Sequence, residues 1–283
     1  MKMENKKQPI YSYSKLTTFI QCEKQYFYQY ILRKESQDNI YNLLGTTIHN
    51  CIEGIQKREM SNQEALETFH DDLEMNEIFG YSFISDKVKN NYVNSIIHFL
   101  KNFKPIDCIK YEIEKEVTAN IDGHLLKGYV DCIIWNEDGT ISVIDFKSSS
   151  MYKKSDLNLH GYQLLIYAIA LQQMGYPPIK DIKWLMCKYA TVKTKRSKKN
   201  ILRCELDEEQ EYEVCYVPFL YNDKTIEECE SWICDTIEQI ESKQEQFEEW
   251  ETTCDSSFFC NTLCSFCKSC SKAKQLKNSF FNR

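Results

Sequence analysis

Apolar residues recur at helical spacing through the first hundred residues of the chain. Over residues 13–34 this spacing defines an aromatic-rich face, and Ser14 is placed to cap the start of the helix. The face consists of Leu16, Phe19, Ile20, Tyr26, Phe27 and Tyr30. The same periodicity predicts helices over 45–57, 62–78 and 86–103. The N-terminal part is therefore expected to be helical.

The hydrophobic period then shortens to that of β-strands. β-branched and aromatic residues predict strands over 110–118, 124–135 and 140–147. A turn of the type that closes hairpins, Asn-Glu-Asp-Gly at 136–139, separates the last two. These two strands are expected to pair with each other.

The second half of the chain alternates between the two periods. A helix is predicted over 157–174 and ends before Pro177-Pro178, strands follow over 181–191 and 200–206, and an acidic helix covers 224–249. Helices on both sides of the strand region predict an α/β fold, in which a mixed central β-sheet is flanked by helices.

Length and composition favour one globular domain. The chain has 283 residues, 42% of them hydrophobic, with only eight glycines and five prolines. We expect a single domain over 1–283, with a helical insertion at 58–103, a core sheet at 104–206 and a C-terminal helix with a cysteine cluster at 207–283. No apolar run could span a membrane and the polar N-terminus lacks a secretory signal, so a cytoplasmic location is expected.

A basic segment stands out against the net charge of −7. It lies between the strands at 181–191 and 200–206, and its cations are candidates for contact with nucleic-acid phosphates. They are Lys193, Lys195, Arg196, Lys198 and Lys199. The alternative interpretation is a solvated hairpin loop.

Two carboxylates and a lysine interrupt apolar strands. Asp145 lies in the run Val-Ile-Asp-Phe, and Lys147 leaves the same strand face two residues later. Asp131 occupies the preceding strand, so pairing around the 136–139 turn would bring the two carboxylates together. Clustered carboxylates suit Mg²⁺ or Mn²⁺, and a neighbouring ammonium suits phosphodiester hydrolysis. An ordinary Asp–Lys ion pair is the alternative for an isolated motif.

Fourteen cysteines are many for a chain of this type, and one group is crowded. Cys260, Cys264, Cys267 and Cys270 lie within eleven residues near the C-terminus. In a cytosolic protein such a density indicates ligation of a metal or a cluster.

Five segments together resemble the RecB-like branch of the PD-(D/E)XK nucleases. The core motif is "GYVD", ending at Asp131, followed by "VIDFKSS", which contains Asp145 and Lys147. "GTTIH", ending at His49, and "QLLIY", from Gln163 to Tyr167, resemble two further motifs of that branch. "YSKL…FIQCEKQY", over 13–26, resembles its N-terminal segment with one cysteine. The resemblance implies a restriction-endonuclease-like core.

The resemblance also implies roles for individual residues. Asp131, Asp145, the Phe146 carbonyl and His49 would be metal ligands, and Lys147 the catalytic lysine. The helix residues Gln163 and Tyr167 would contact the lysine or the DNA backbone. Three glutamates alternate along the strand at 110–118: Glu112, Glu114 and Glu116. One of them could lie near the metal, although a solvated strand face is the simpler interpretation.

Iron–sulfur members of the branch use one N-terminal and three C-terminal cysteines. The resemblance implies a [4Fe–4S] cluster on Cys22, Cys264, Cys267 and Cys270, which would clasp the two chain ends together. The spacing Cys-x2-Cys-x2-Cys departs from the family's Cys-x2-Cys-x5-Cys, so Cys260 is an alternative ligand. Structural Zn²⁺ on the same thiolates is the second possibility.

The function implied is that of a metal-dependent DNA nuclease, with exonuclease action on single strands or DNA ends preferred to sequence-specific cleavage. The alternatives are a catalytically weak DNA-binding or assembly subunit of a recombination or CRISPR-adaptation complex, and an RNA substrate. The chain contains no helicase P-loop motif, so unwinding would need a helicase partner. A recombinase or integrase partner is also compatible with the resemblance.

Overall fold

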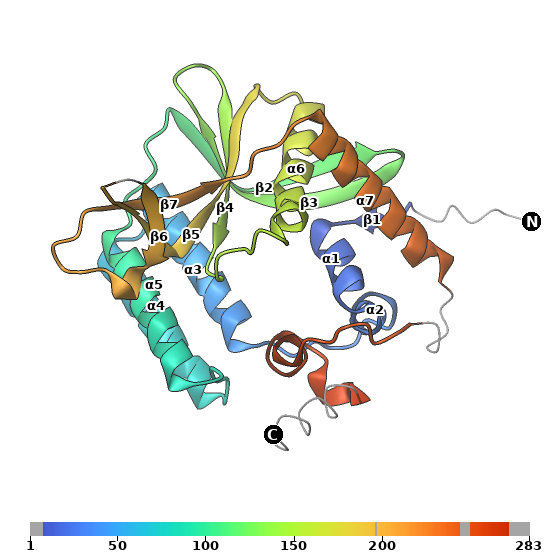
Figure 1. The fold of residues 1–283 in the computed structure, drawn as a ribbon, viewed down its shortest axis with the longest axis horizontal. Helices are drawn as coiled ribbons and strands as arrows, with labels where there is room; N and C mark the ends of the chain where they lie inside the picture. The colour runs from blue at the N-terminus through green and yellow to red at the C-terminus, as the bar shows by residue number, and fades with distance from the viewer. Residues whose placement is uncertain (1–7, 196, 244–249, 272–283) are drawn as a thin grey trace, which may run out of the picture.

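The computed structural model describes residues 8–195, 197–243 and 250–271. Seven strands form one mixed sheet in this part of the chain. They are β1 (Ile10–Tyr11), β2 (Lys110–Ile121), β3 (His124–Trp135), β4 (Ile141–Lys147), β5 (Ile179–Lys193), β6 (Lys198–Leu202) and β7 (Tyr212–Pro218). The predicted mixed sheet flanked by helices is confirmed (Figure 1).

Two long strands, β3 and β5, organise the sheet. β3 pairs antiparallel with β2 along one edge, and its other edge is shared by β1 and β4. β4 and β5 run parallel, β6 pairs antiparallel with the distal part of β5, and β7 pairs antiparallel with both the earlier and the distal parts of β5. β4 pairs with β3 only as far as Cys132–Ile144, and continues alone with β5 to Lys147. The sheet therefore opens between β3 and β4 just where Asp131 and Asp145 lie.

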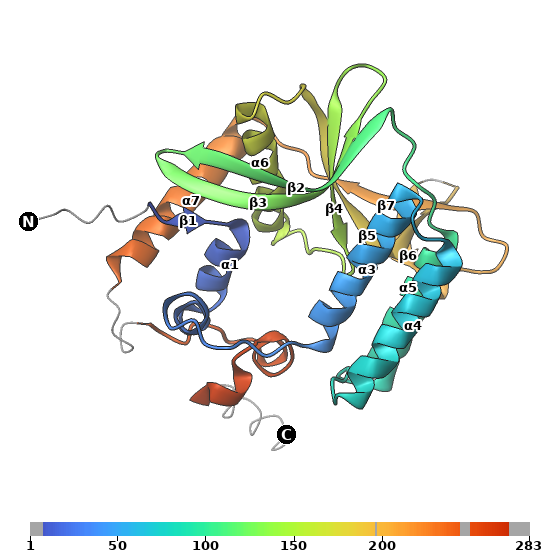
Figure 2. The same ribbon diagram turned by 180° about the vertical axis from the view of Figure 1, so that it is seen from behind.

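Helices cover the sheet from both sides. The longer ones are α1 (Tyr13–Gln21), α3 (Ile40–Lys57), α4 (Asn62–Ile78), α5 (Asp86–Asn102), α6 (Leu157–Gln173) and α7 (Asp223–Ser242). Short turns are α2 (Glu23–Tyr26), the π-helical turns at Phe27–Ile31 and Phe259–Leu263, and the 3₁₀ turns at Arg203–Glu205 and Cys267–Ser269. One core joins the sheet to α1, α6 and α7, and a second joins it to α3, α4 and α5 (Figures 1 and 2).

β4 has a core on both of its faces. Ile141 and Val143 pack in the core of α6 and α7, whereas Ile144 and Phe146 pack in the core of α3 to α5. Because successive strand side chains alternate, Asp145 belongs to the face that α6 covers. A strand buried on both faces has little access to water, which is why a carboxylate on it needs a specific partner.

Several predicted boundaries were wrong. The expected helix over 13–34 is broken at Cys22, whose backbone is extended, and Ser12 rather than Ser14 caps α1. The helix with His49 begins earlier, at Ile40, because Asn39 caps it. These differences follow from capping side chains and a backbone break that apolar periodicity does not report.

The second half of the chain also differs in detail. The strand expected over 200–206 ends at Leu202 and continues as a 3₁₀ turn. β7, which pairs with β5, was not predicted at all. The acidic helix ends at Ser242, and the rest of its expected range, 244–249, lies outside the described residues. Within the described ranges, no helix is both long enough and apolar enough to cross a membrane.

Candidate active site

The Asp145–Lys147 pair is central to the site. Asp145 is 1% exposed, and its Oδ2 lies 2.6 Å from Lys147 Nζ. Beyond this close ion pair, Asp145 Oδ2 accepts no hydrogen bond from any described residue. A buried carboxylate oxygen with a free lone pair is suited to a cation.

Helix α6 orients the lysine. Lys147 Nζ donates to Gln163 Oε1 at 3.1 Å, and Gln163 Nε2 donates to the Tyr167 hydroxyl at 2.9 Å. Gln163 and Tyr167 can act in series because residues four apart share one helix face. Gly128 of β3 makes this possible, since a Cβ there would lie 2.8 Å from the Tyr167 ring. The predicted Gln-x-x-x-Tyr pair is therefore next to the lysine.

His49 and Asp131 approach the same end of β4 from opposite sides. Asp131 Oδ2 accepts from the Phe146 backbone N–H at 2.6 Å, and His49 Nε2 lies 3.0 Å from the Phe146 carbonyl oxygen. His49 Nδ1 is 3.7 Å from Asp131 Oδ2. The structure thus gathers the four predicted metal-ligating residues, Asp145 included, around one strand end.

Glu114 joins this group from β2. Ile113 faces Cys132 and Lys115 faces Val130, so the register is continuous and Glu114 lies opposite Asp131. The backbone of Glu114 has a positive φ of 48°, which is unusual for a strand residue. Ligand atoms of Glu114, His49 and Asp131 lie within 4.8 Å of one another.

The solvated-face interpretation therefore holds for only some of the alternating glutamates. Glu112 binds the ammonium groups of Lys110 and Lys115, and Glu116 binds that of Lys127, as surface ion pairs do. Glu114 alone of the three lies beside His49 and Asp131. Sequence periodicity could not single it out, because its place opposite Asp131 follows from the register of β2 with β3.

The site holds its ionisable groups in unusual states. Burial raises the pKa of Asp131 well above its ordinary value, and the Asp145 charge adds to this. Burial also lowers the pKa of His49, so its ring is neutral at neutral pH. For Lys147, burial alone would lower the pKa, but the Asp145 carboxylate outweighs it and raises the pKa above its ordinary value. Crowded carboxylates that resist ionisation and a neutral imidazole are features of a site that gains from a divalent cation.

The donor set fits a divalent cation. It offers carboxylate oxygens of Asp131, Asp145 and Glu114, one backbone carbonyl and one imidazole nitrogen. Oxygen ligands suit Mg²⁺ and Mn²⁺, and the imidazole favours Mn²⁺. The carbonyl oxygen of Phe146 and Nε2 of His49 are separated by 3.0 Å, a spacing that two neighbouring ligands of one small cation also have.

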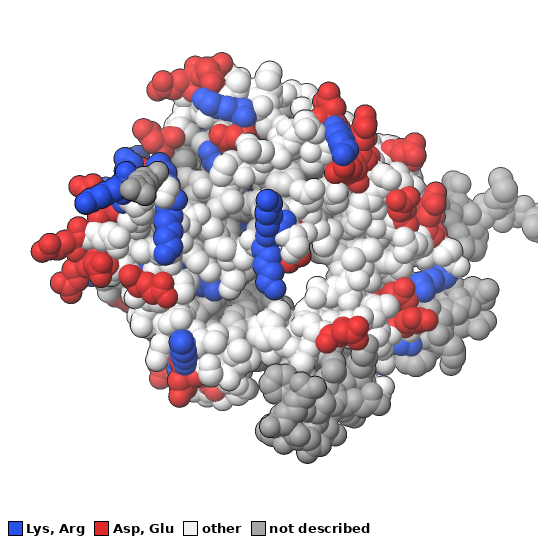
Figure 3. Space-filling view, in the orientation of Figure 1, with Lys and Arg blue, Asp and Glu red and all other residues white. Residues whose placement is uncertain are grey.

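The basic segment at 193–199 carries less unpaired positive charge than the sequence indicates. Lys193 and Lys198 pair across the β5–β6 hairpin with Glu213 of β7, at 3.3 and 2.6 Å. Figure 3 shows basic side chains gathered at the hairpin tip with acidic ones beside them. Lys195 and Lys199 are exposed, and Arg196 lies outside the described residues. Two of the predicted phosphate contacts therefore already have a carboxylate partner.

The predicted cluster cysteines meet at the chain ends. Cys22, Cys254 and Cys260 are buried against one another, with Cys267 and Cys270 packed around them. Cys264 is close enough to Cys22, Cys267 and Cys270 for their charges to interact. Burial raises the pKa of Cys264 to about 11 and that of Cys260 to about 12. Cys254 was missed by the sequence reasoning, although it precedes Cys260 in the same segment.

Comparisons with known proteins find curated relatives and a similar solved structure. Three curated relatives, from Streptococcus agalactiae serotypes Ia, V and III, are each named as one subunit of an ATP-dependent helicase/deoxyribonuclease. Each is 28% identical over 151 residues, a match that covers 49% of this chain and 14% of the relative. A solved structure from Eubacterium rectale, described as a candidate exonuclease, aligns over 97% of this chain and 93% of its own with 12% identity and a TM-score of 0.49.

The family comparison covers nearly all the described residues. The model of the PD-(D/E)XK nuclease superfamily matches residues 10–271, a range that includes every residue of the site and the cysteine-rich segment. The chain belongs to the PD-(D/E)XK nuclease superfamily.

Proposed function

We propose that this chain is a divalent-metal-dependent deoxyribonuclease that hydrolyses phosphodiester bonds, acting as an exonuclease on single strands or DNA ends. The observation that carries the proposal is the Asp145–Lys147 pair, placed beside the ligand group of His49, Glu114 and Asp131. A carboxylate set suited to a cation and a lysine held by a glutamine are the parts that phosphodiester hydrolysis needs.

Each residue has a proposed task. Asp131, Asp145, Glu114, His49 and the Phe146 carbonyl would hold the cation, which when bound would polarise the phosphate and activate water. Lys147 is protonated at neutral pH because Asp145 raises its pKa, so it supplies a fixed positive charge to the phosphate oxygens. Gln163 and Tyr167 act as positioning residues for that lysine.

The cysteine-rich segment supports a second part of the proposal, a [4Fe–4S] cluster on Cys22, Cys264, Cys267 and Cys270. The described thiols of Cys22, Cys260, Cys264, Cys267 and Cys270 lie in one neighbourhood, which supports a group shared between the N-terminal and C-terminal cysteines. A cluster, in which each thiolate binds a different iron, is proposed ahead of Zn²⁺ on the resemblance to iron–sulfur nucleases.

Unwinding of duplex DNA would be the task of a helicase and not of this nuclease domain. The match to the curated relatives covers 14% of their length, and their name includes a helicase activity. We propose a helicase partner or helicase region for this nuclease, with a recombinase or integrase as alternatives. The division into insertion, core sheet and C-terminal segment stays a prediction.

Digestion of labelled DNA tests the function directly. Single-stranded and duplex DNA, labelled at either the 5′ or the 3′ end, would be incubated with Mn²⁺, Mg²⁺ or EDTA. We expect cleavage only with a cation, with mononucleotides or short products released progressively from one labelled end. Asp145→Ala should be inactive. Cleavage that persists in EDTA or in Asp145→Ala would contradict the proposal, and an equal rate on RNA would change the substrate.

A further inference from the structure

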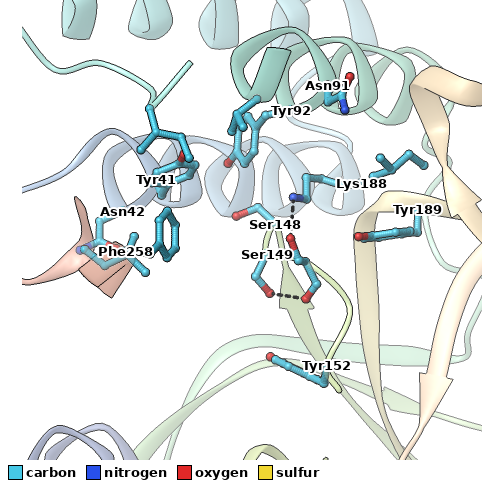
Figure 4. A pocket seen from close by; sticks show the side chains of 15 residues that line it. Tyr41, Asn42, Asn91, Tyr92, Ser148, Ser149, Tyr152, Lys188, Tyr189 and Phe258 are labelled. Carbon is cyan, nitrogen blue, oxygen red and sulfur yellow. Dashed lines mark hydrogen bonds between the residues drawn. The ribbon is translucent and has the colours of Figure 1, made fainter. Parts of the chain in front are cut away.

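A cavity of about 670 Å³ opens beside Ser148, the residue that follows Lys147. Ser148, Ser149 and Ser150, which follow the lysine in sequence, form one wall. Helices α3 and α5, strand β5 and the cysteine-rich segment form the others (Figure 4). Its size is typical of a pocket for a small molecule or a single nucleotide. Tyr152, which lines the cavity, is close enough to Lys147 and Asp145 for their charges to interact, so the cavity adjoins the site.

Aromatic rings dominate the lining. Tyr41, Tyr92, Tyr152, Tyr189 and Phe258 come from five separate segments and surround the hollow (Figure 4). Phe258 is 48% exposed, which is unusual for so large an apolar side chain, and it stands at the rim. Flat aromatic surfaces around a cavity of this size suit a planar ring that can stack on them.

Two polar groups of the cavity could each take a ligand as an additional partner. Tyr92 is 3% exposed, yet its hydroxyl makes no hydrogen bond with any described residue, even though Ser148 lies beside it. A buried hydroxyl without a partner is costly, so a ligand that supplies one is favoured. Lys188 places its ammonium 3.4 Å from Ser150 Oγ, and it has no carboxylate partner within the described ranges.

We propose that this cavity is a base-binding subsite, which takes one unpaired nucleobase of the substrate strand while Lys188 contacts the adjacent phosphate. A strand whose scissile phosphate lies at Lys147 must continue past Ser148, and its next base meets the aromatic lining. Hydrogen-bonding groups inside and a cation at the wall match a base and its phosphate.

The proposal specifies the substrate of the proposed nuclease, and it rests on that function. A base enclosed by α3, α5 and the cysteine-rich segment cannot remain paired with a complementary strand. The substrate class is therefore single-stranded DNA or a frayed end, with little preference for base identity, because stacking is available to every base.

Binding to abasic DNA tests the subsite apart from cleavage. The full chain in EDTA would be titrated with fluorescein-labelled oligodeoxythymidylates, each lacking one base, and followed by anisotropy. We expect one position at which loss of the base weakens binding by about fivefold to a hundredfold. Phe258→Ala should weaken binding of the intact strand and remove most of that penalty, whereas Phe258→Tyr should keep it.

Two further variants make the test specific. Phe79→Ala, at a ring that is 71% exposed and lies outside the cavity lining, should bind as the wild type does. Lys188→Gln should weaken intact and abasic strands equally and flatten the salt dependence by about 0.7 in slope. An abasic penalty that is absent, or is unchanged in Phe258→Ala, would overturn the subsite. If such a protein still cleaves DNA with Mn²⁺, the nuclease function stands without it.

Discussion

Lys147 and His49 belong to one site but are held in opposite charge states. Asp145 raises the pKa of the lysine, whereas burial lowers the pKa of the histidine. The lysine is therefore a permanent cation, and the histidine is neutral with a lone pair available to a cation. These two states follow from neighbours that come from different elements, and each can be tested by a single substitution.

Removing the ammonium should affect catalysis without affecting metal binding. We expect Lys147→Ala to lower kcat by about a hundredfold or more, because one preorganised electrostatic group is lost. Mn²⁺ affinity, measured by calorimetry, should be close to that of the wild type, since an ammonium is not a ligand. Lys180→Ala, which removes an exposed lysine paired with Asp138, is the matched control. Parallel loss of Mn²⁺ affinity and activity would refute this division of tasks.

Stability should depend on pH through His49. Its pKa is lowered from 6.5 in the folded state, so below that pH the unfolded chain binds more protons than the folded one. The free energy of unfolding therefore falls as pH drops from about 6.5 toward the folded pKa. In EDTA, His49→Gln should lose less stability than the wild type between about pH 7.5 and about pH 5. Urea unfolding at both pH values measures this, and identical losses would show that His49 contributes nothing.

At the scale of elements, the β5–β6 hairpin and helix α6 make separate contributions. The hairpin presents basic residues, two of which Glu213 neutralises from the neighbouring strand. Helix α6 positions Gln163 and Tyr167 beside Lys147. The position of the helix depends on a close approach of Gly161 to Phe219, which follows β7. Each element can therefore be altered without touching a metal ligand.

Glu213 should limit the affinity of the basic segment for DNA, because it pairs with two of its lysines. Glu213→Gln frees Lys193 and Lys198, so binding of single-stranded DNA should tighten and its dependence on log salt should steepen by up to about 0.7 per lysine. Replacing Lys193, Lys195, Lys198 and Lys199 by Ala should have the opposite effect. Anisotropy titrations at several salt concentrations give the slopes. If neither variant changes the slope, the basic segment is only a solvated loop, the alternative open from the sequence.

The start of α6 should tolerate no side chain at Gly161. A Cβ there would lie 2.2 Å from the Phe219 ring, a distance that forces a shift. We expect Gly161→Ala to destabilise the fold by about 1–3 kcal/mol and to lower activity, since Gln163 lies two residues further on. Phe219→Leu combined with Gly161→Ala should recover part of both losses. Urea unfolding and the cleavage assay measure them, and additive losses in the double variant would refute the proposed clash.

At the scale of the whole molecule, the two chain ends are joined. Cys22 packs against Cys254 and Cys260, and backbone hydrogen bonds link Lys24 to Glu251 and Gln37 to Ser265. Figure 1 shows the C-terminal segment lying between α2 and the start of α3. The same segment carries Phe258 into the cavity beside Ser148. Any group that holds these ends together would therefore also shape the proposed base-binding subsite.

Loss of the proposed cluster should remove the colour of the protein and lower its stability. Purified anaerobically, the protein should be brown and contain iron and acid-labile sulfide. Cys22→Ser or Cys264→Ser should remove the colour and lower the melting temperature, because the loop that the cluster closes is nearly the whole chain. Cys51→Ser is the control, because Cys51 is buried in the core that the sheet forms with α3, α4 and α5.

Iron analysis of single cysteine variants, purified in the same way, shows which C-terminal cysteines bind the cluster. Cys270→Ser should lose the iron, whereas Cys260→Ser should keep it if Cys264, Cys267 and Cys270 are the C-terminal ligands. A colourless protein that contains zinc would replace the cluster by a structural Zn²⁺ site. A metal-free protein whose stability is unaffected by Cys22→Ser would refute a cluster that links the chain ends, and would not bear on the proposed nuclease site.

Local pattern in the sequence was sufficient for the centre of the site. Asp145 and Lys147 share a face because a strand has a period of two, and Gln163 and Tyr167 share a face because a helix brings residues four apart together. The turn at 136–139 set the pairing that places Asp131 near Asp145. Short-range spacing therefore determined which side chains share a face of one element, whereas the contact of Gln163 with Lys147 was expected only from the resemblance to the RecB-like nucleases. A central mixed sheet between helices followed from the order of the periods.

Only the tertiary structure decided what the remaining residues do. Glu114 reaches His49 because the register of β2 with β3 places it opposite Asp131, and Glu213 neutralises the basic segment because β7 lies along β5. The rings around the cavity come from segments far apart in sequence. Such contacts depend on register, backbone conformation and long-range packing, which the hydrophobic pattern of a single element does not encode.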